Sequence, residues 1–287
     1  MIWLGEKRGN LSDWTTQMWV RATGREVSLA ENSWLAGPTG GTRQIGKDFF
    51  DDYAGREKLL IVENGVRGLI PDFACLRLPP VAEGVREFYE QTSEFELDAW
   101  SEWHGMFRPF GTALSLIFSS RLQQLNVPLS PLDSARGMTS RVLQMQAGGA
   151  VTETAWVREL NATGKVIYAG CYSVCEIPGC ESPCVKVVFP LPNGRAIVLM
   201  KTEALRDGSA SLRSMGAGFG DPGFYFVVQG EQGRVWARYV SSLKEEIRVY
   251  PAESGAARAD HRFWFWGIEF LRIHYRMRRN ALPPAAG

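Results

Sequence analysis

The stretch CVKVVFPLPNGRAIVLMKTEA, residues 184–204, decides the fold. Its two halves, 184–191 and 195–204, are apolar and rich in valine and isoleucine, as strands usually are. Between them, Pro192, Asn193 and Gly194 are residues of the kind that join neighbouring antiparallel strands. The stretch therefore predicts a β-hairpin that belongs to a larger sheet.

Similar runs extend from this hairpin in both directions along the chain. They cover residues 140–146, 151–160 and 165–175 before it, and 210–215, 223–230, 233–240, 245–251 and 260–277 after it. The breaks between the runs are short, which indicates antiparallel neighbours instead of parallel strands joined by helices. We predict an α+β protein whose C-terminal half is a large curved antiparallel sheet or an open β-barrel.

The N-terminal part is expected to supply amphipathic helices that pack on this sheet. Helical spacing of apolar residues predicts helices over 81–91 and over Phe110–Leu125, and a shorter helix over 46–54. Short strands are expected at 59–62 and 94–99, and short strands or turns within 1–47. We predict a mixed helical and irregular region over 1–135 and a sheet region over 136–287, joined in one integrated domain because the helices need the sheet to bury their apolar faces.

Composition and charge narrow the function classes. The chain has 287 residues, of which 45% are hydrophobic and 22% charged, and its 32 Lys and Arg residues nearly balance its 31 Asp and Glu residues. No net charge attracts the chain to nucleic acid, so no nucleic-acid partner is expected. No apolar run approaches the ~18 residues of a spanning helix and no signal peptide is recognisable. We therefore expect a soluble, cytoplasmic protein without a membrane span.

The run at 260–277 carries most of the candidate ligand-binding residues. Interpreted as one long strand, it places Trp264, Trp266, Arg272 and His274 on a common face, where the last two turn toward solvent or a cavity. His104 follows a series of carboxylates, which suits either a general base or an ordinary turn residue. These five residues are the predicted ligand-binding set, whereas catalytic residues stay unassigned and no cofactor is expected.

Four clustered cysteines offer a second kind of chemistry. Cys171, Cys175, Cys180 and Cys184 are spaced three, four and three residues apart, unlike the pairs of a zinc ribbon. On a strand, Cys171 and Cys175 lie ~13 Å apart, too far for one metal ion unless the strand bends. Unligated thiols are favoured over a metal site or a labile disulfide, which stay open as alternatives.

Two glycine-rich loops lack the signature of a nucleotide site. The loop 37–42 precedes an expected helix and has N–H groups that could hold an anion, but no Gly-Lys-Ser/Thr sequence follows it. The loop 216–223 leads into a strand, whereas a dinucleotide fingerprint leads into a helix. Both loops are therefore interpreted as ordinary connections.

The sequence leaves three functions open. The favoured one is binding of a hydrophobic small molecule in a cavity between sheet and helix, with enzymatic activity undecided. The alternatives are a structural or interaction protein that forms a homo-oligomer, and a metal- or redox-linked protein that uses the four cysteines.

Overall fold

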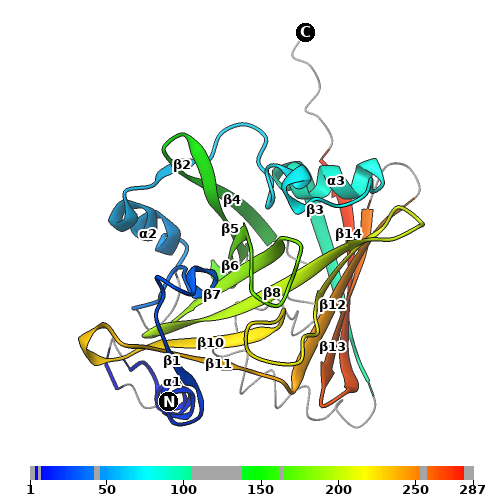
Figure 1. The fold of residues 1–287 in the computed structure, drawn as a ribbon. Coiled ribbons are helices and arrows are strands. Elements are labelled where there is room, and N and C mark those ends of the chain that lie inside the picture. Colours follow the sequence, from blue (N-terminus) through cyan, green and yellow to red (C-terminus); the bar gives the residue numbers. More distant parts are fainter. Residues whose placement is uncertain are drawn as a thin grey trace.

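An open, strongly curved antiparallel sheet organises the chain (Figure 1). The computed structural model describes residues 4–5, 8–41, 46–104, 138–161, 164–252 and 257–280. Within them the sheet has 14 strands, and its main path runs in the order β2-β4-β5-β6-β7-β8-β9-β12-β13-β14-β3. The predicted α+β class and the large antiparallel sheet are confirmed, and the sheet is open.

The elements follow one another along the chain with short connections in the C-terminal half. The α-helices are α1 (Leu11–Thr23), α2 (Phe49–Glu57) and α3 (Glu83–Glu90), and a 3-10 helix, η1, spans Ser33–Leu35. The strands are β1 (Arg25–Val27), β2 (Leu60–Val62), β3 (Phe95–Trp103), β4 (Met138–Ala147), β5 (Ala150–Leu160), β6 (Lys165–Cys175), β7 (Cys184–Leu191), β8 (Gly194–Ala204), β9 (Ala210–Ser214), β10 (Phe224–Gln229), β11 (Val235–Tyr239), β12 (Leu243–Pro251), β13 (Ala257–Phe265) and β14 (Ile268–Arg279).

The hairpin that decides the fold is present as expected. Strands β7 and β8 pair from Cys184 opposite Lys201 to Leu191 opposite Gly194. The turn places Asn193 in the left-handed region, at φ +56°. Asparagine tolerates this conformation better than most residues, so the local sequence favours the turn that forms.

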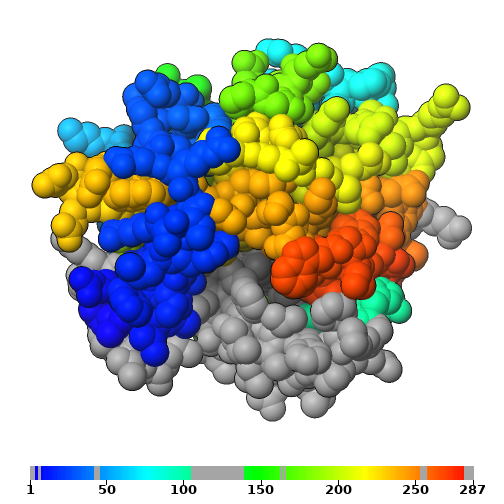
Figure 2. All heavy atoms as spheres, turned by 60° about the horizontal axis from the view of Figure 1, so that its bottom comes forward, coloured from blue at the N-terminus to red at the C-terminus, as the bar shows by residue number. Residues whose placement is uncertain are grey.

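Strand β8 divides the sheet into two branches. Its residues 194–198 pair with β10, and its residues 201–204 pair with β9. From β10 the shorter branch continues through β11 to β1, while the other branch continues from β9 through β12, β13 and β14 to β3. Helix α1 packs on β10 and β11, and Figure 2 shows the blue N-terminal segment beside the yellow and orange strands.

The strands around β8 are buried on both faces. Alternate residues such as Val187, Phe189, Val198 and Met200 belong to the inner core, which also includes Val85, Phe88 and Tyr89 of α3. The intervening residues, such as Val188, Ile197 and Leu199, belong to an outer core with Trp34 of η1 and Phe49 and Phe50 of α2. Helices α2 and α3 therefore cover opposite faces of the sheet, since successive strand residues point to opposite sides.

Two expectations from the sequence were wrong. Residues 260–277 form two strands, β13 and β14, because Trp266 and Gly267 both have positive φ angles and make a turn. Residues 11–23 form helix α1 instead of short strands or turns, with a capping box in which Asn10 accepts from the backbone of residue 13 and the Asp13 carboxylate accepts from the Asn10 N–H at 2.7 Å. The expected helix over Phe110–Leu125 and the boundary near residue 135 lie outside the described residues and stay predictions.

Candidate functional site

A cleft opens on the outer face of β5–β8, between these strands, helix α2 and the chain at residues 36–41. One lobe, of about 650 Å³, is lined by Leu29, Ala36, Gly37, Thr39, Gly40, Gly41, Tyr53, Arg56, Glu57, Glu153, Asn193, Arg195 and Gln229. A second lobe, of about 310 Å³, shares Tyr53, Glu57 and Glu153 and adds Leu59, Thr152, Ser173, Val174 and Lys186. These volumes lie in the range of small-ligand sites, and the lining combines polar and apolar surface.

Arg195 lies at the bottom of the larger lobe. Only 2% of its surface is exposed. Its Nη1 donates to the Gly37 carbonyl at 2.6 Å, while its buried Nε has no hydrogen-bond partner in the part of the chain that the structure describes. Burial lowers the pKa of Arg195 to about 10, and Glu153 opposes that effect from a distance. A charged guanidinium is thus held in the wall of the cleft with one donor left over.

Lys186 is the corresponding cation of the smaller lobe. It is 7% exposed, and its Nζ donates to the Ala36 carbonyl at 3.2 Å. The two cations therefore bond neighbouring carbonyls of one chain segment, which crosses the sheet over Val188. That crossing requires glycine at position 37, because a Cβ there would lie 2.9 Å from Val188 Cγ2 and φ is +151°.

A tyrosine–glutamate pair separates the two lobes. The Tyr53 hydroxyl, carried by α2, donates to Glu153 Oε2 of β5 at 3.0 Å. Burial, followed by the Glu153 charge, raises the pKa of Tyr53, so the phenol stays protonated and acts as a donor. The pair gives the cleft one acceptor-rich wall opposite its cationic wall.

The glycine-rich loop forms the rim of the larger lobe. Gly40 bridges to Pro192 and Gly194 at the β7–β8 turn, and its carbonyl accepts from Asn193 N at 2.9 Å. The Asn193 side chain donates to the Gln229 carbonyl at 2.6 Å. The glycine-rich sequence is compatible with anion binding by this loop, but nothing in the local sequence connects the loop with Arg195. The sequence feature that could have indicated the cleft is the presence of Lys186 and Arg195 within or beside runs of apolar strand residues.

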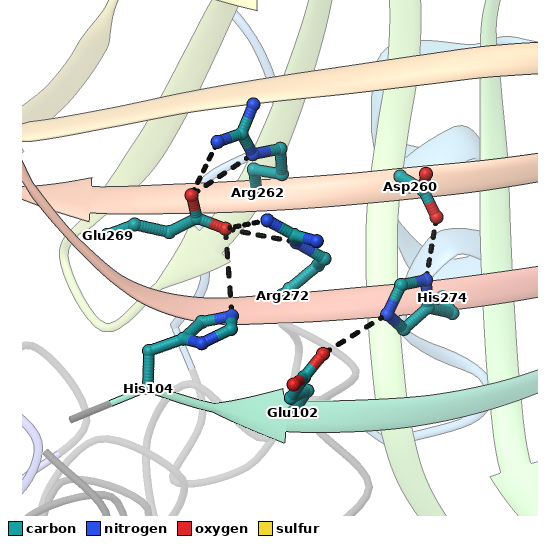
Figure 3. Close-up of polar contacts among 7 residues, drawn as sticks. All are labelled: Glu102, His104, Asp260, Arg262, Glu269, Arg272 and His274. Atoms are coloured by element: carbon teal, nitrogen blue, oxygen red, sulfur yellow. Dashed lines mark hydrogen bonds and ion pairs between the residues drawn. The ribbon is translucent and has the colours of Figure 1, made fainter.

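Most of the predicted ligand-binding residues lie elsewhere, on the outer surface of β13, β14 and β3 (Figure 3). Glu269 accepts from Arg262 and from Arg272, with Nη2 distances of 2.5 and 2.8 Å, and His104 Nε2 lies 3.7 Å from it. The hydrogen bond from Arg262, and then that from Arg272, lowers the pKa of Glu269. This single carboxylate therefore pairs with two guanidinium groups and offsets part of their charge.

His274 belongs to a second set of polar contacts on the same three strands. Its Nδ1 lies 2.6 Å from Asp260, its Nε2 lies 3.6 Å from Glu102, and its ring stacks on Trp100 at 5.4 Å. Figure 3 shows it between these two carboxylates. Arg272 and His274 thus lie on one face of β14, as the side-chain alternation predicts, and His104 at the end of β3 lies near Glu269.

The two tryptophans of the predicted set lie in different places. Trp264 lies under the Arg262 guanidinium, at 4.8 Å from its ring, next to this network. Trp266 stands at the tip of the β13–β14 hairpin and is 77% exposed. The turn that sequence analysis missed accounts for the separation. A ligand-binding role for the five residues stays a prediction.

Another polar cluster lies inside the curved sheet. His261 Nε2 lies 3.0 Å from Glu245 Oε2, and the hydroxyls of Tyr168 and Tyr172 are 2.5 Å apart. Burial, followed by Tyr172 and more weakly Glu245, raises the pKa of Tyr168. Arg158, which is 2% exposed, belongs to the same interior. Strands far apart in the sheet therefore meet across its concave face.

The cysteines are free thiols, and three of them gather where β6 meets β7. Within the described residues, no three or more His, Cys, Asp and Glu side chains are grouped so that they could hold a metal ion. Cys171 lies apart from the other three, near Glu153 in the outer core.

Comparison with known proteins gives one distant relative to report. The chain is 26% identical over 245 residues to a Bacillus subtilis (strain 168) protein named uncharacterized membrane protein YndJ. The alignment covers 82% of this chain and 41% of YndJ, so the chain spans less than half of that relative. No family model matches the chain, and no solved structure matches it.

The predicted cytoplasmic location is corrected by this relative, whose name assigns it to a membrane. The expectation rested on the missing apolar run, which says nothing of the remaining length of a longer protein. Among the described residues, no helix has the length and apolar character needed to cross a bilayer.

Proposed function

We propose that the protein binds a small ligand through an anionic group, phosphoryl or carboxyl, in the cleft between α2 and the outer face of β5–β8. The observation that carries this proposal is Arg195, a nearly fully buried guanidinium among the residues that line an open cleft, whose buried Nε has no hydrogen-bond partner within the described residues. Burying a cation without a carboxylate partner is costly, and an incoming anion offsets that cost.

The rest of the lobe suits the same chemistry. Arg56 of α2 and the side-chain amides of Asn193 and Gln229 supply further donors, and the glycine-rich rim exposes main chain without side chains to block access. A guanidinium binds carboxylate or phosphate oxygens through parallel N–H donors, which favours this class of ligand over neutral ones. Tyr53 and Glu153 then offer contacts to a hydroxyl or amine on the same ligand.

Calorimetric titration with pyrophosphate in chloride buffer tests the proposal. The wild-type chain is expected to release or absorb heat with a saturable isotherm, and Arg195→Met is expected to weaken the affinity about tenfold or more, as loss of a charged hydrogen bond implies. Arg206→Met is the matched control, because Arg206 is exposed and is not among the residues that line either lobe. Absence of binding, or equal affinity of wild type and Arg195→Met, would overturn the proposal.

A hydrophobic small molecule remains a second candidate ligand. It is supported by the concave inner face, where apolar residues surround a few polar groups such as His261, Glu245 and Tyr168. Native mass spectrometry of the purified chain tests it, since a retained lipid-like molecule would add a discrete mass. The homo-oligomer and metal-linked alternatives stay predictions.

A further inference from the structure

Three thiols meet at the end of the β6–β7 hairpin. Cys175 is the last residue of β6 and stands directly opposite Cys184, the first residue of β7. Cys180 lies in the loop between them, and its thiol is close enough to Cys184 to interact with it. Cys184 is fully buried, whereas Cys175 and Cys180 are half-buried and accessible to small reagents.

The register places Cys175 and Cys184 within reach of a covalent bond. Directly opposed residues of antiparallel strands have Cα atoms ~4.5 or ~5.5 Å apart. A disulfide spans Cα separations of roughly 4.4 to 6.8 Å, so either kind of pair fits it. Both side chains point to the same face of the sheet, since paired residues share a face. No backbone movement is needed to join them.

The surroundings favour a slow, reagent-dependent reaction over spontaneous oxidation. Burial, and then the neighbouring Cys180 thiol, raises the pKa of Cys184. Burial also raises the pKa of Cys175, which the Lys186 charge partly opposes. Cys180 lies in the loop, is half-buried and adjoins the buried Cys184, so it is the natural entry point for an external oxidant.

We propose that Cys175 and Cys184 form a reversible disulfide through Cys180, with a small-molecule disulfide such as oxidised glutathione as the oxidant. The Cys180 thiolate attacks one sulfur of the oxidant, forms a mixed disulfide and expels one glutathione thiolate. Cys184, after losing its proton to solvent, attacks the Cys180 sulfur and expels the second glutathione thiolate. Cys175, likewise deprotonated, attacks Cys184, and Cys180 leaves as a thiolate. Overall, two protein thiols and one oxidised glutathione give one protein disulfide and two reduced glutathiones.

The bond would act on a loop with contacts beyond the hairpin. Gly179 donates its N–H to the Gly220 carbonyl at 2.9 Å, which ties the β6–β7 loop to the loop before β10. Asp221 holds that second loop closed by accepting from the N–H groups of Ala217 and Gly218, both at 2.9 Å. Oxidation would therefore fix the β6–β7 connection next to the point where β8 divides the sheet.

Peptide mapping decides which sulfurs pair. The folded protein is treated with oxidised glutathione, its free thiols are blocked with N-ethylmaleimide, and it is digested with trypsin and glutamyl endopeptidase together. Cleavage after Lys165, Glu176, Glu181 and Lys186 separates Cys175, Cys180 and Cys184 into three different peptides. The expected product is peptide 166–176, which carries Cys171 as well as Cys175, linked to peptide 182–186 with two hydrogens lost, and fragment ions of the linked pair are expected to place the bond on Cys175. A Cys180–Cys184 link as the final product, or no link containing Cys184, would overturn the proposal.

Single variants separate the three roles. Cys175→Ser is expected to stop at the Cys180–Cys184 link, and Cys180→Ser to form the same product as wild type about tenfold more slowly. Cys75→Ser is the control, because Cys75 packs against the inner core, whereas the three hairpin cysteines belong to the outer core, and its oxidation should match wild type. Unchanged rates for Cys180→Ser would refute its role as the entry thiol. Persistent glutathionylation without an internal disulfide would refute the exchange itself.

Discussion

Replacing Arg195 by methionine is expected to leave the unliganded protein at least as stable as wild type. Burial lowers the pKa of Arg195 to about 10, well below its value in an unfolded chain. Because the folded-state value is the lower one, the charge is disfavoured in the folded state at every pH below about 10. The difference corresponds to about 3 kcal/mol at neutral pH.

The substitution also removes a favourable contact. The hydrogen bond from the guanidinium to the Gly37 carbonyl contributes roughly 1.5–3 kcal/mol, as for other charged donors. Water can replace that donor, since Gly37 borders the open cleft. The balance predicts a change in the free energy of unfolding between zero and about 2 kcal/mol in favour of the variant.

Urea unfolding at pH 7, followed by tryptophan fluorescence, measures both the intrinsic change and the response to ligand. Pyrophosphate at about a hundred times its wild-type dissociation constant should stabilise wild type by about 2.7 kcal/mol, and Arg195→Met, whose affinity is about tenfold or more lower, by about 1.4 kcal/mol or less. A loss of 3 kcal/mol or more in Arg195→Met without ligand would show that Arg195 serves to hold the chain at residue 37. That result would refute the interpretation of this arginine as an anion receptor.

Two further predictions concern the backbone and pH. Gly68→Ala should destabilise the protein by roughly 3 kcal/mol or more, because the new Cβ would overlap the backbone of Tyr89 and Glu90. Gly55→Ala in α2, where a Cβ meets no atom within 4 Å, should instead stabilise the protein by ~0.5–1 kcal/mol. Urea unfolding compares the two variants, and similar free energies of unfolding would contradict the close approach at Gly68. Hydrogen bonds from Ser209 lower the pKa of Asp207 to about 2, so the contribution of Asp207 to stability is present above about pH 4 and lost as the pH falls through 2. Asp207→Asn should lack this pH dependence. If the free energies of unfolding of Asp207→Asn and wild type differ by a constant amount between these pH values, the prediction is wrong.

The hairpins of the C-terminal sheet could be predicted because each is encoded locally. Alternation of side chains and turn residues such as Asn193 and Gly194 lie within a few residues of one another. The break after Phe265 escaped prediction because an aromatic residue, Trp266, occupies a left-handed turn position that usually favours glycine or asparagine. The following glycine, Gly267, was the available signal.

The cleft could not be predicted, because its parts are distant in the sequence. Lys186 and Arg195 meet the carbonyls of Ala36 and Gly37 across sequence separations of 150 and 158 residues. Side-chain alternation indicated correctly that Arg272 and His274 share a face. It did not indicate that Glu269 pairs with Arg272 and that Asp260 pairs with His274. Pairing across strands, which fixes charge balance, is a property of the fold.

The division of the sheet at β8 gives its two branches different structural roles. The branch through β9 and β12 curves around the interior, while the branch through β10 supports the helix α1 and, at Gln229, the wall of the cleft. The loops 205–209 and 230–234 lie in different branches, the first between β8 and β9 and the second between β10 and β11. A change in the register of β8 would therefore shift the interior and the cleft together, because both branches start from this strand.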